Sequence, residues 1–173
     1  MTKLEVKPLE WKDLSFFWSC LQANNEYNFI FRVKTKEELQ RWFVKDYTDY
    51  TKKTRKESIA NSKAENPNSS WIPSKQINQW LIFYYERKKI GASNFRGDED
   101  DCEVQILMSA RWKNKGLGKL FLFLSEIYIK KNHKNIDLVY ANIKSDNIAS
   151  QKIFVSNGYK NEMHLDYYKY FKN

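Results

Sequence analysis

One short stretch of the sequence places glycines among lysines in a way that suits the binding of an anion. It follows an apolar run at 104–108 and opens a strongly helical segment at 117–131. At such a strand-to-helix turn the backbone N–H groups converge, the helix dipole adds partial positive charge, and glycines let the backbone approach an anion closely. The sequence therefore predicts a phosphate-binding loop made of Lys113, Asn114, Lys115, Gly116, Leu117, Gly118 and Lys119.

Cysteines and histidines provide no second reactive centre. Cys20 and Cys102 lie far apart, without the spacing of a metal pair, and we expect buried thiols in a reducing compartment. Neither His133 nor His164 has a partner at ligand spacing. The sequence predicts no metal site and no cysteine nucleophile.

The composition indicates a single globular domain over 1–173 with a cytoplasmic location. Hydrophobic residues make up 42% of the chain, which is enough for a packed core. No apolar run reaches the roughly 18 residues of a membrane span, and the first residues lack the apolar segment of a signal peptide. The formal net charge of +9 suits phosphate-bearing small molecules. A nucleic-acid partner is disfavoured, because the lysines are mixed with acids and no aromatics alternate with basic residues.

The first part of the chain is predicted to hold a strand and two helices. We expect the strand over 4–9, one helix over 13–23, and a second helix that starts at Thr35 with a capping box closed by Glu38. From about 61 to 79 the composition shifts to Asn, Ser, Pro and Lys. This shift predicts a long polar loop, 61–79, within the domain.

The rest of the chain alternates between strands and helices. We expect strands over 80–85, 90–95, 102–108 and 137–142, helices over 117–131 and 147–156, and a final strand pair over 159–171. Because two of the helices cross between strands, part of the sheet must be parallel. We therefore predict a mixed α/β (α+β) fold.

This order of elements and two motifs resemble the GNAT (Gcn5-related) N-acetyltransferase superfamily. The family's pyrophosphate loop, (Arg/Gln)-x-x-Gly-x-(Gly/Ala), is matched by residues 113–118 except at its first position, where this chain has lysine. The second motif, Asn-x-x-(Ala/Ser)-x-x-x-(Tyr/Phe)-x-x-x-Gly-(Phe/Tyr), is matched by residues 147–159. The resemblance covers 80–160, and it implies a GNAT-like, mostly antiparallel central sheet with helices on both faces.

The resemblance also implies acetyl-CoA as the cofactor. The fourth strand would splay from the fifth and offer its backbone to the pantetheine amides, while N–H groups of the glycine loop would hold the pyrophosphate. Asn147 would face the pantetheine arm, and Phe154 would lie beside the thioester. The cofactor-binding residues implied in this way are Leu107, Met108, Ser109, Lys113, Asn114, Lys115, Gly116, Leu117, Gly118, Lys119, Asn142, Asn147 and Phe154.

Transfer of an acetyl group to an amine requires the amine to lose a proton, because lysine-like amines have a pKa of about 10.4. Glu103 stands where the family often has a glutamate, and strand alternation places it on the face opposite Val104. We predict Glu103 as the general base, acting directly or through water. A solvent-facing strand glutamate is the alternative.

The acid that reprotonates the leaving thiolate is harder to assign. Many members of the family have a tyrosine where this chain has Phe154. Tyr159, Tyr140 and a water molecule are the candidates, and Tyr159 is also expected as a packed strand residue. A thiolate with a pKa of about 8.5 can also leave without an acid.

Aromatic residues mark the expected acceptor site. We expect it beside the loop after the first helix, the second helix and the last hairpin, with Tyr27, Phe29 and Tyr167 as substrate-binding residues. Rings and amides suit a sugar or a small polar amine, although core packing also explains them. The basic run at 52–56 suits an acceptor that bears a phosphate, or is a solvated helix end.

Together these residues predict an acetyl-CoA-dependent N-acetyltransferase. The acceptor would be a primary amine of a small molecule, such as an amino sugar, attacking directly in a ternary complex. Acetylation of a protein N-terminus or of a lysine side chain is the alternative among enzymes. A non-catalytic acyl-CoA-binding module is the alternative from another class, and homodimerisation is left open.

Overall fold

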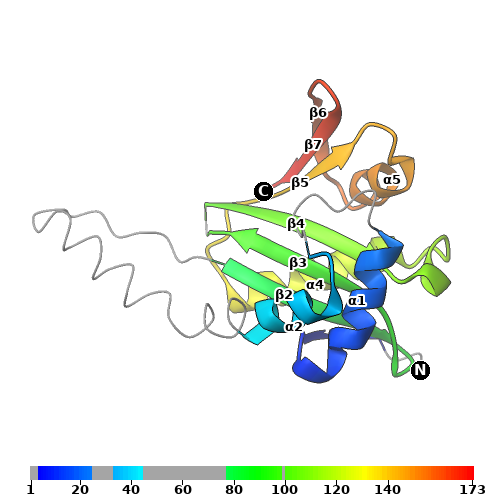
Figure 1. Cartoon of the computed structure of the whole chain (residues 1–173). Coiled ribbons are helices and arrows are strands. Elements are labelled where there is room, and N and C mark those ends of the chain that lie inside the picture. Colours follow the sequence, from blue (N-terminus) through cyan, green and yellow to red (C-terminus); the bar gives the residue numbers. More distant parts are fainter. Residues whose placement is uncertain (1–3, 25–32, 45–76, 99) are drawn as a thin grey trace, which may run out of the picture.

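The structure is a computed structural model that describes residues 4–24, 33–44, 77–98 and 100–173. The described strands form one mixed sheet with helices on both of its faces (Figure 1). The strand order is β1-β2-β3-β4-β5-β7-β6. The predicted mixed fold with a mostly antiparallel sheet is confirmed.

The described elements follow the order expected from the sequence. The strands are β1 (Leu4–Pro8), β2 (Ile77–Tyr85), β3 (Lys88–Gly97), β4 (Asp101–Met108), β5 (Leu138–Lys144), β6 (Lys160–Met163) and β7 (Tyr167–Lys172). The helices are α1 (Leu14–Ala23), α2 (Lys36–Trp42), α4 (Gly118–Asn132) and α5 (Ile148–Ser156), with short 3₁₀ turns at η1 (Trp11–Asp13) and η4 (Ala110–Trp112). None of the described helices is both long and apolar enough to cross a membrane.

Hydrophobic side chains are buried on both faces of the sheet. On one face, Phe17 of α1 and Leu39 of α2 pack against the central strands. On the other face, Leu122 of α4 and Phe154 of α5 do the same. A strand covered on both faces needs apolar residues at every position, which explains the continuous apolar run at 80–83 in β2.

The junction between β4 and β5 differs from the rest of the sheet. These two strands are parallel, whereas the other described pairs are antiparallel. Their pairing joins residues 101–103 to residues 138–140 and ends there. Beyond this point the strands run apart, as Figure 1 shows. The second half of β4 therefore turns one backbone edge toward a gap in the sheet.

The start of α2 has the predicted N-cap, but its capping box is not closed as predicted. Thr35 Oγ1 accepts a hydrogen bond from Glu38 N at 3.1 Å. Glu38 Oε2 accepts one from the backbone N–H of Lys34 at 2.8 Å, one residue before the N-cap, instead of from Thr35. The two bonds still fix the start of the helix that carries the buried Leu39.

The predicted C-terminal boundary of the polar loop, 61–79, is too late in the sequence. Ile77–Gln79 belong to β2, and Ile77 is buried opposite Gly97 of β3. Burial of the isoleucine side chain in the core outweighs the polar composition around it, so the strand begins earlier than the sequence indicates. The remainder of the loop, 61–76, lies outside the described residues.

Candidate active site

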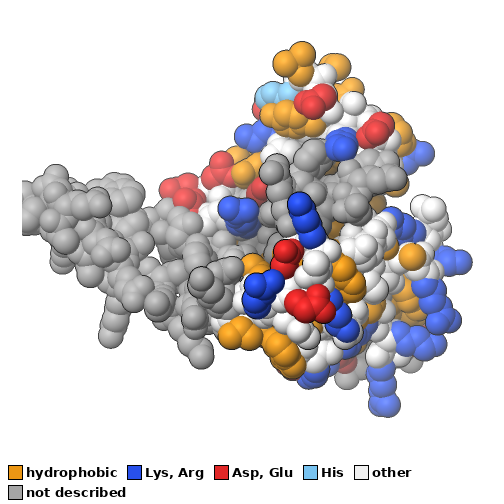
Figure 2. All heavy atoms as spheres, viewed as in Figure 1, with side chains coloured by type: hydrophobic (Ala, Val, Ile, Leu, Met, Phe, Trp, Pro, Cys, Tyr) orange, Lys and Arg blue, Asp and Glu red, His pale blue; other side chains and the backbone are white. Residues whose placement is uncertain are grey.

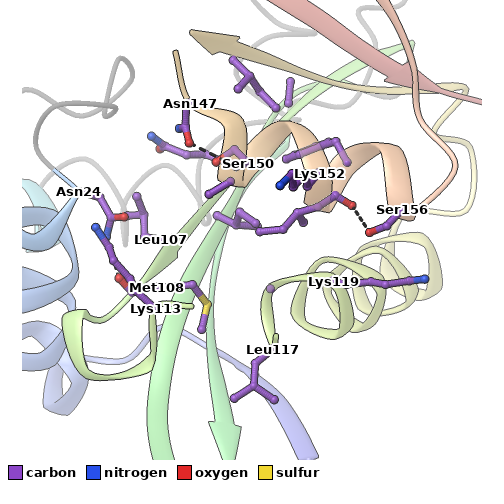
Figure 3. A pocket seen from close by; sticks show the side chains of 18 of the residues that line it. Asn24, Leu107, Met108, Lys113, Leu117, Lys119, Asn147, Ser150, Lys152 and Ser156 are labelled. Carbon is purple, nitrogen blue, oxygen red and sulfur yellow. Dashed lines mark hydrogen bonds between the residues drawn. The ribbon is translucent and has the colours of Figure 1, made fainter. Parts of the chain in front are cut away.

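A cavity of about 700 Å³ opens where β4 and β5 separate. Its walls come from the second half of β4, the middle of β5, the loop before α4, and α5 (Figure 3). Every predicted cofactor-binding residue except Ser109 lines this cavity, and so does Glu103. The glycine loop and the second motif, which are distant in the sequence, therefore meet around one space.

The hydrogen-bond ladder decides which backbone groups of β4 face the gap. Ser109 N donates to Ile90 O at 3.0 Å, and residues along an antiparallel ladder alternate between bonding to the partner strand and pointing away from it. The register with β3 turns the backbone groups of Leu107 toward β3 and those of Ile106 and Met108 toward the gap. Of Leu107, Met108 and Ser109, the predicted cofactor-binding residues at the end of this strand, only Met108 has this orientation. The sequence did not indicate Ile106.

Two side chains connect the end of α1 to the end of β4 and to the glycine loop. Asn24 Nδ2 donates to Cys20 O at 2.7 Å and to Met108 O at 2.8 Å. Lys113 Nζ donates to Ala23 O, and Figure 3 shows Lys113 next to Asn24. The last carbonyls of a helix carry partial negative charge, so an ammonium group binds well there. The side chain of Lys113 thus fixes the loop, and Asn24 is a cavity residue that the sequence did not indicate.

The start of α4 presents backbone N–H groups to the cavity. The N-cap residue is Leu117, and no side chain of the described residues caps the helix. The first N–H groups of a helix have no acceptor within it, and the positive end of the dipole of this 15-residue helix lies here. Since Gly116, Gly118 and Lys119 line the cavity as well, the loop can hold an anion through its backbone.

The two glycines of the loop serve different purposes. Gly116 has a φ of 74°, a left-handed conformation, and a Cβ there would meet open space. A Cβ on Gly118 would instead collide with the Ile153 side chain of α5. Gly116 therefore permits the turn of the chain, whereas Gly118 permits the close packing of α4 on α5.

The second motif builds the wall opposite the loop. Asn147 lines the cavity from the N-cap of α5, where its Oδ1 accepts a hydrogen bond from Ser150 N at 3.2 Å. Phe154 is buried, and its ring meets that of Tyr159 edge-on at 4.8 Å between centroids. Gly158 follows the helix with a φ of 83°. The motif thus starts, packs and ends α5 along the cavity.

Glu103 and Asn142 close the narrow end of the cavity, where strand pairing stops. Asn142 Nδ2 donates to Glu103 Oε1 at 3.1 Å. Burial raises the pKa of Glu103 above its ordinary value, while the hydrogen bond from Asn142 and the charge of Arg96 act in the opposite direction. A half-buried carboxylate with a raised pKa, at the edge of a cavity, can accept a proton from a bound group.

The structure does not bring Tyr159 to the cavity. Its hydroxyl donates to Glu126 Oε1 at 2.7 Å, and burial raises the pKa of Tyr159 far above its ordinary value. Lys172 Nζ pairs with Glu126 Oε2 at 2.9 Å, so this cluster ties α4 to β7. Tyr140 does not line the cavity either, and burial raises its pKa to about 12. The described residues that line the cavity include no tyrosine, histidine or cysteine.

The structure describes only one of the three predicted substrate-binding residues, Tyr167. Tyr27 and Phe29 lie outside the described residues. Tyr167 pairs with Lys144 and therefore lies on the sheet face that carries Asn142, and its ring stacks on His164 at 4.7 Å between centroids. Within the described ranges, no group of His, Cys, Asp and Glu side chains could hold a metal ion.

Comparison with known families identifies this arrangement. Residues 4–160 match the family model described as an acetyltransferase (GNAT) domain. The chain belongs to the GNAT acetyltransferases. It is an enzyme whose cofactor is acetyl-CoA, and the family match extends the resemblance of the two motifs into the first part of the chain. Among curated proteins, no sequence matches significantly.

Solved structures share this GNAT fold over nearly the whole chain. Spermidine N-acetyltransferase from Vibrio cholerae, in complex with CoA and spermine, is 16% identical over 98% of this chain and 94% of its own, with a TM-score of 0.66. RimL, a ribosomal L7/L12 alpha-N-protein acetyltransferase in complex with coenzyme A, is 11% identical over 99% and 94%, with a TM-score of 0.70. Campylobacter jejuni N-acetyltransferase PseH, in complex with acetyl coenzyme A, is 15% identical over 98% of both chains, with a TM-score of 0.56. Their names span small amines and proteins as acceptors, so the shared fold leaves the acceptor undetermined.

Proposed function

We propose that this GNAT enzyme acetylates a primary amine of a small molecule, such as an amino sugar, by direct attack in a ternary complex. One observation carries the proposal. The cavity joins the uncapped start of α4 to Glu103 at the point where β4 and β5 separate. It therefore combines an anion site with a carboxylate that can accept a proton.

The residues present fit acetyl-CoA. Backbone N–H groups at 116–119 suit the diphosphate, and the backbone groups of Ile106 and Met108 on the gap side suit the pantetheine amides. The cavity of about 700 Å³ is in the size range of cofactor sites. When bound, acetyl-CoA supplies the acetyl group as an activated thioester.

Glu103 takes the proton of the attacking amine in this proposal, directly or through one water molecule. Its raised pKa improves it as a base, and Asn142 holds the carboxylate in place. An acetyl-enzyme intermediate is disfavoured, because Cys20 and Cys102 are both fully buried away from the cavity lining. Burial raises the pKa of each thiol to about 12, which leaves them protonated and unreactive.

The leaving thiolate receives its proton from water in this proposal. Phe154 occupies the motif position that carries a phenol in many relatives, and the Tyr159 hydroxyl is bonded to Glu126. A thiolate with a pKa of about 8.5 is stable enough to leave without a positioned acid.

Thermal unfolding with acetyl-CoA, CoA and ATP tests the cofactor site first. Ligand at 100 times its Kd stabilises the folded state by about 2.7 kcal/mol, or several degrees. We expect the shift with acetyl-CoA and CoA but not with ATP. Thiol release in the presence of amines then tests the reaction. CoA binding without turnover of any small amine or peptide would support the non-catalytic alternative and contradict the proposal.

A further inference from the structure

Lys169 of β7 lies on the same sheet face as Glu103, outside the residues that line the cavity. It pairs in register with Asn142, the residue whose amide bonds to Glu103. Its Nζ lies 4.9 Å from the centre of the Tyr140 ring, and Tyr140 pairs with Glu103 across β4 and β5. The ammonium group is therefore directed from β7 toward the strand position that carries Glu103.

Within the described part of the chain, this ammonium group forms no ion pair. The acid opposite it in the ladder, Glu162 of β6, is bonded to His164 at 3.3 Å instead. The positive charge of Lys169 acts to lower the pKa of Asp101, although the two form no ion pair among the described residues. A half-buried ammonium group held over a ring, with no described carboxylate paired to it, is available to bind an incoming anion.

A second cation flanks Glu103 on its other side. Arg96 of β3 pairs with Glu103 in register, and it too forms no ion pair among the described residues. Figure 2 looks onto this face and shows basic and acidic side chains together over the ends of β3 and β4. Arg96 next to the base, and Lys169 farther along the same face, disfavour a second positive charge on the acceptor and favour a negative one.

We propose that the acceptor carries an anionic group, a phosphate or a carboxylate, which Lys169 binds while Glu103 takes the proton from the amine. The inference rests on the proposed function and narrows its substrate class to amines that also bear negative charge. Lys169 and Glu103 lie two strands and two residues apart, which corresponds to about 12 Å between their Cα atoms. The Lys169 ammonium group lies over the ring of Tyr140, the residue paired with Glu103, so a molecule of the size of a sugar phosphate spans the two groups.

Paired acceptors test this inference in the thiol-release assay with acetyl-CoA. Glucosamine 6-phosphate is compared with glucosamine, γ-aminobutyrate with its methyl ester, and spermidine serves as a polycation. We expect the anionic member of at least one pair to have a kcat/KM about tenfold higher, since hydrogen bonds to charged groups are of this strength. Lys169→Gln should remove the preference through KM, with kcat nearly unchanged. Lys160→Gln, an exposed lysine of β6 on the same face, should leave it intact.

Several results would overturn the inference without touching the proposed function. One is turnover of glucosamine, the methyl ester or spermidine that equals or exceeds turnover of the anionic acceptors. Another is a preference for the anionic acceptors that persists in Lys169→Gln. If acetyl-CoA binds but no acceptor turns over, the affinities of the same acceptors for the protein–CoA complex are measured by calorimetry. Equal affinity of the two members within both pairs would reject the inference. Absence of acetyl-CoA binding rejects the proposed function itself.

Discussion

The two ends of the cavity are built in different ways. The end at the start of α4 consists of consecutive residues, 113–119, that act mainly through their backbone. The narrow end consists of single side chains from separate strands, Glu103 of β4 and Asn142 of β5, with Lys169 of β7 paired to Asn142 outside the lining. In the proposed function, the first end holds the diphosphate of the cofactor and the second end meets the acceptor. On this proposal, changes of register or of one side chain at the second end alter specificity without disturbing the cofactor site.

Removing the carboxylate at the narrow end should have the largest effect. Glu103→Gln keeps the shape and the hydrogen bond from Asn142 but cannot accept a proton. We expect kcat/KM to fall about 100-fold, with the Kd of acetyl-CoA unchanged. Glu162→Gln, an exposed acid on the same face, is the matched control. A wild-type rate for Glu103→Gln would remove this residue from the mechanism.

Gly118→Val should cause the largest damage at the other end. Its side chain would collide with Ile153, so α4 and α5 must separate. We expect the free energy of unfolding in urea to fall by about 2 kcal/mol and acetyl-CoA binding to weaken. Ile153→Ala added to this variant should restore part of the loss. If the losses in the free energy of unfolding caused by the two substitutions simply add, the collision with Ile153 is not the cause of the loss at Gly118.

Gly116→Ala separates backbone strain from packing. A Cβ at this position meets open space, but the φ of 74° is unfavourable for alanine. We expect a loss of about 1 kcal/mol in the free energy of unfolding, less than for Gly118→Val. The same urea titration compares the two variants. A larger loss at Gly116 than at Gly118 would reverse the roles assigned to the two glycines.

Asn142→Leu should have the smallest effect, a shift in the pH profile. The hydrogen bond from Asn142 lowers the pKa of Glu103, so its loss moves that pKa further upward. Because the base must be deprotonated, activity is lost as the pH falls through this pKa. The acidic limb of kcat/KM against pH should therefore move to higher pH. An unchanged limb, or one at lower pH, would contradict the role of this bond.

Prediction from the sequence succeeded where the determinants are local. The strand-to-helix turn at Gly116 and the N-cap at Thr35 depend on residues within one or two turns of each other. It failed where distant segments meet. Ile77 is buried in the core and extends β2. The backbone groups of Ile106 face the gap because of the register between β3 and β4. The ammonium group of Lys113 is bound by the end of α1, which nothing in the loop indicates.

The sequence by itself determined the order of the elements, the family and the glycine turn that precedes α4. These follow from periodicity, from residues that permit particular backbone angles, and from motifs at fixed spacing. Only the tertiary structure decided that Tyr159 is bonded to Glu126 and that Asn24 reaches Met108. It also paired Lys169 with Asn142, whose amide is bonded to Glu103. The reason is physical, because contacts between strands depend on register and on the point where β4 and β5 part, and neither is set by neighbouring residues in the chain.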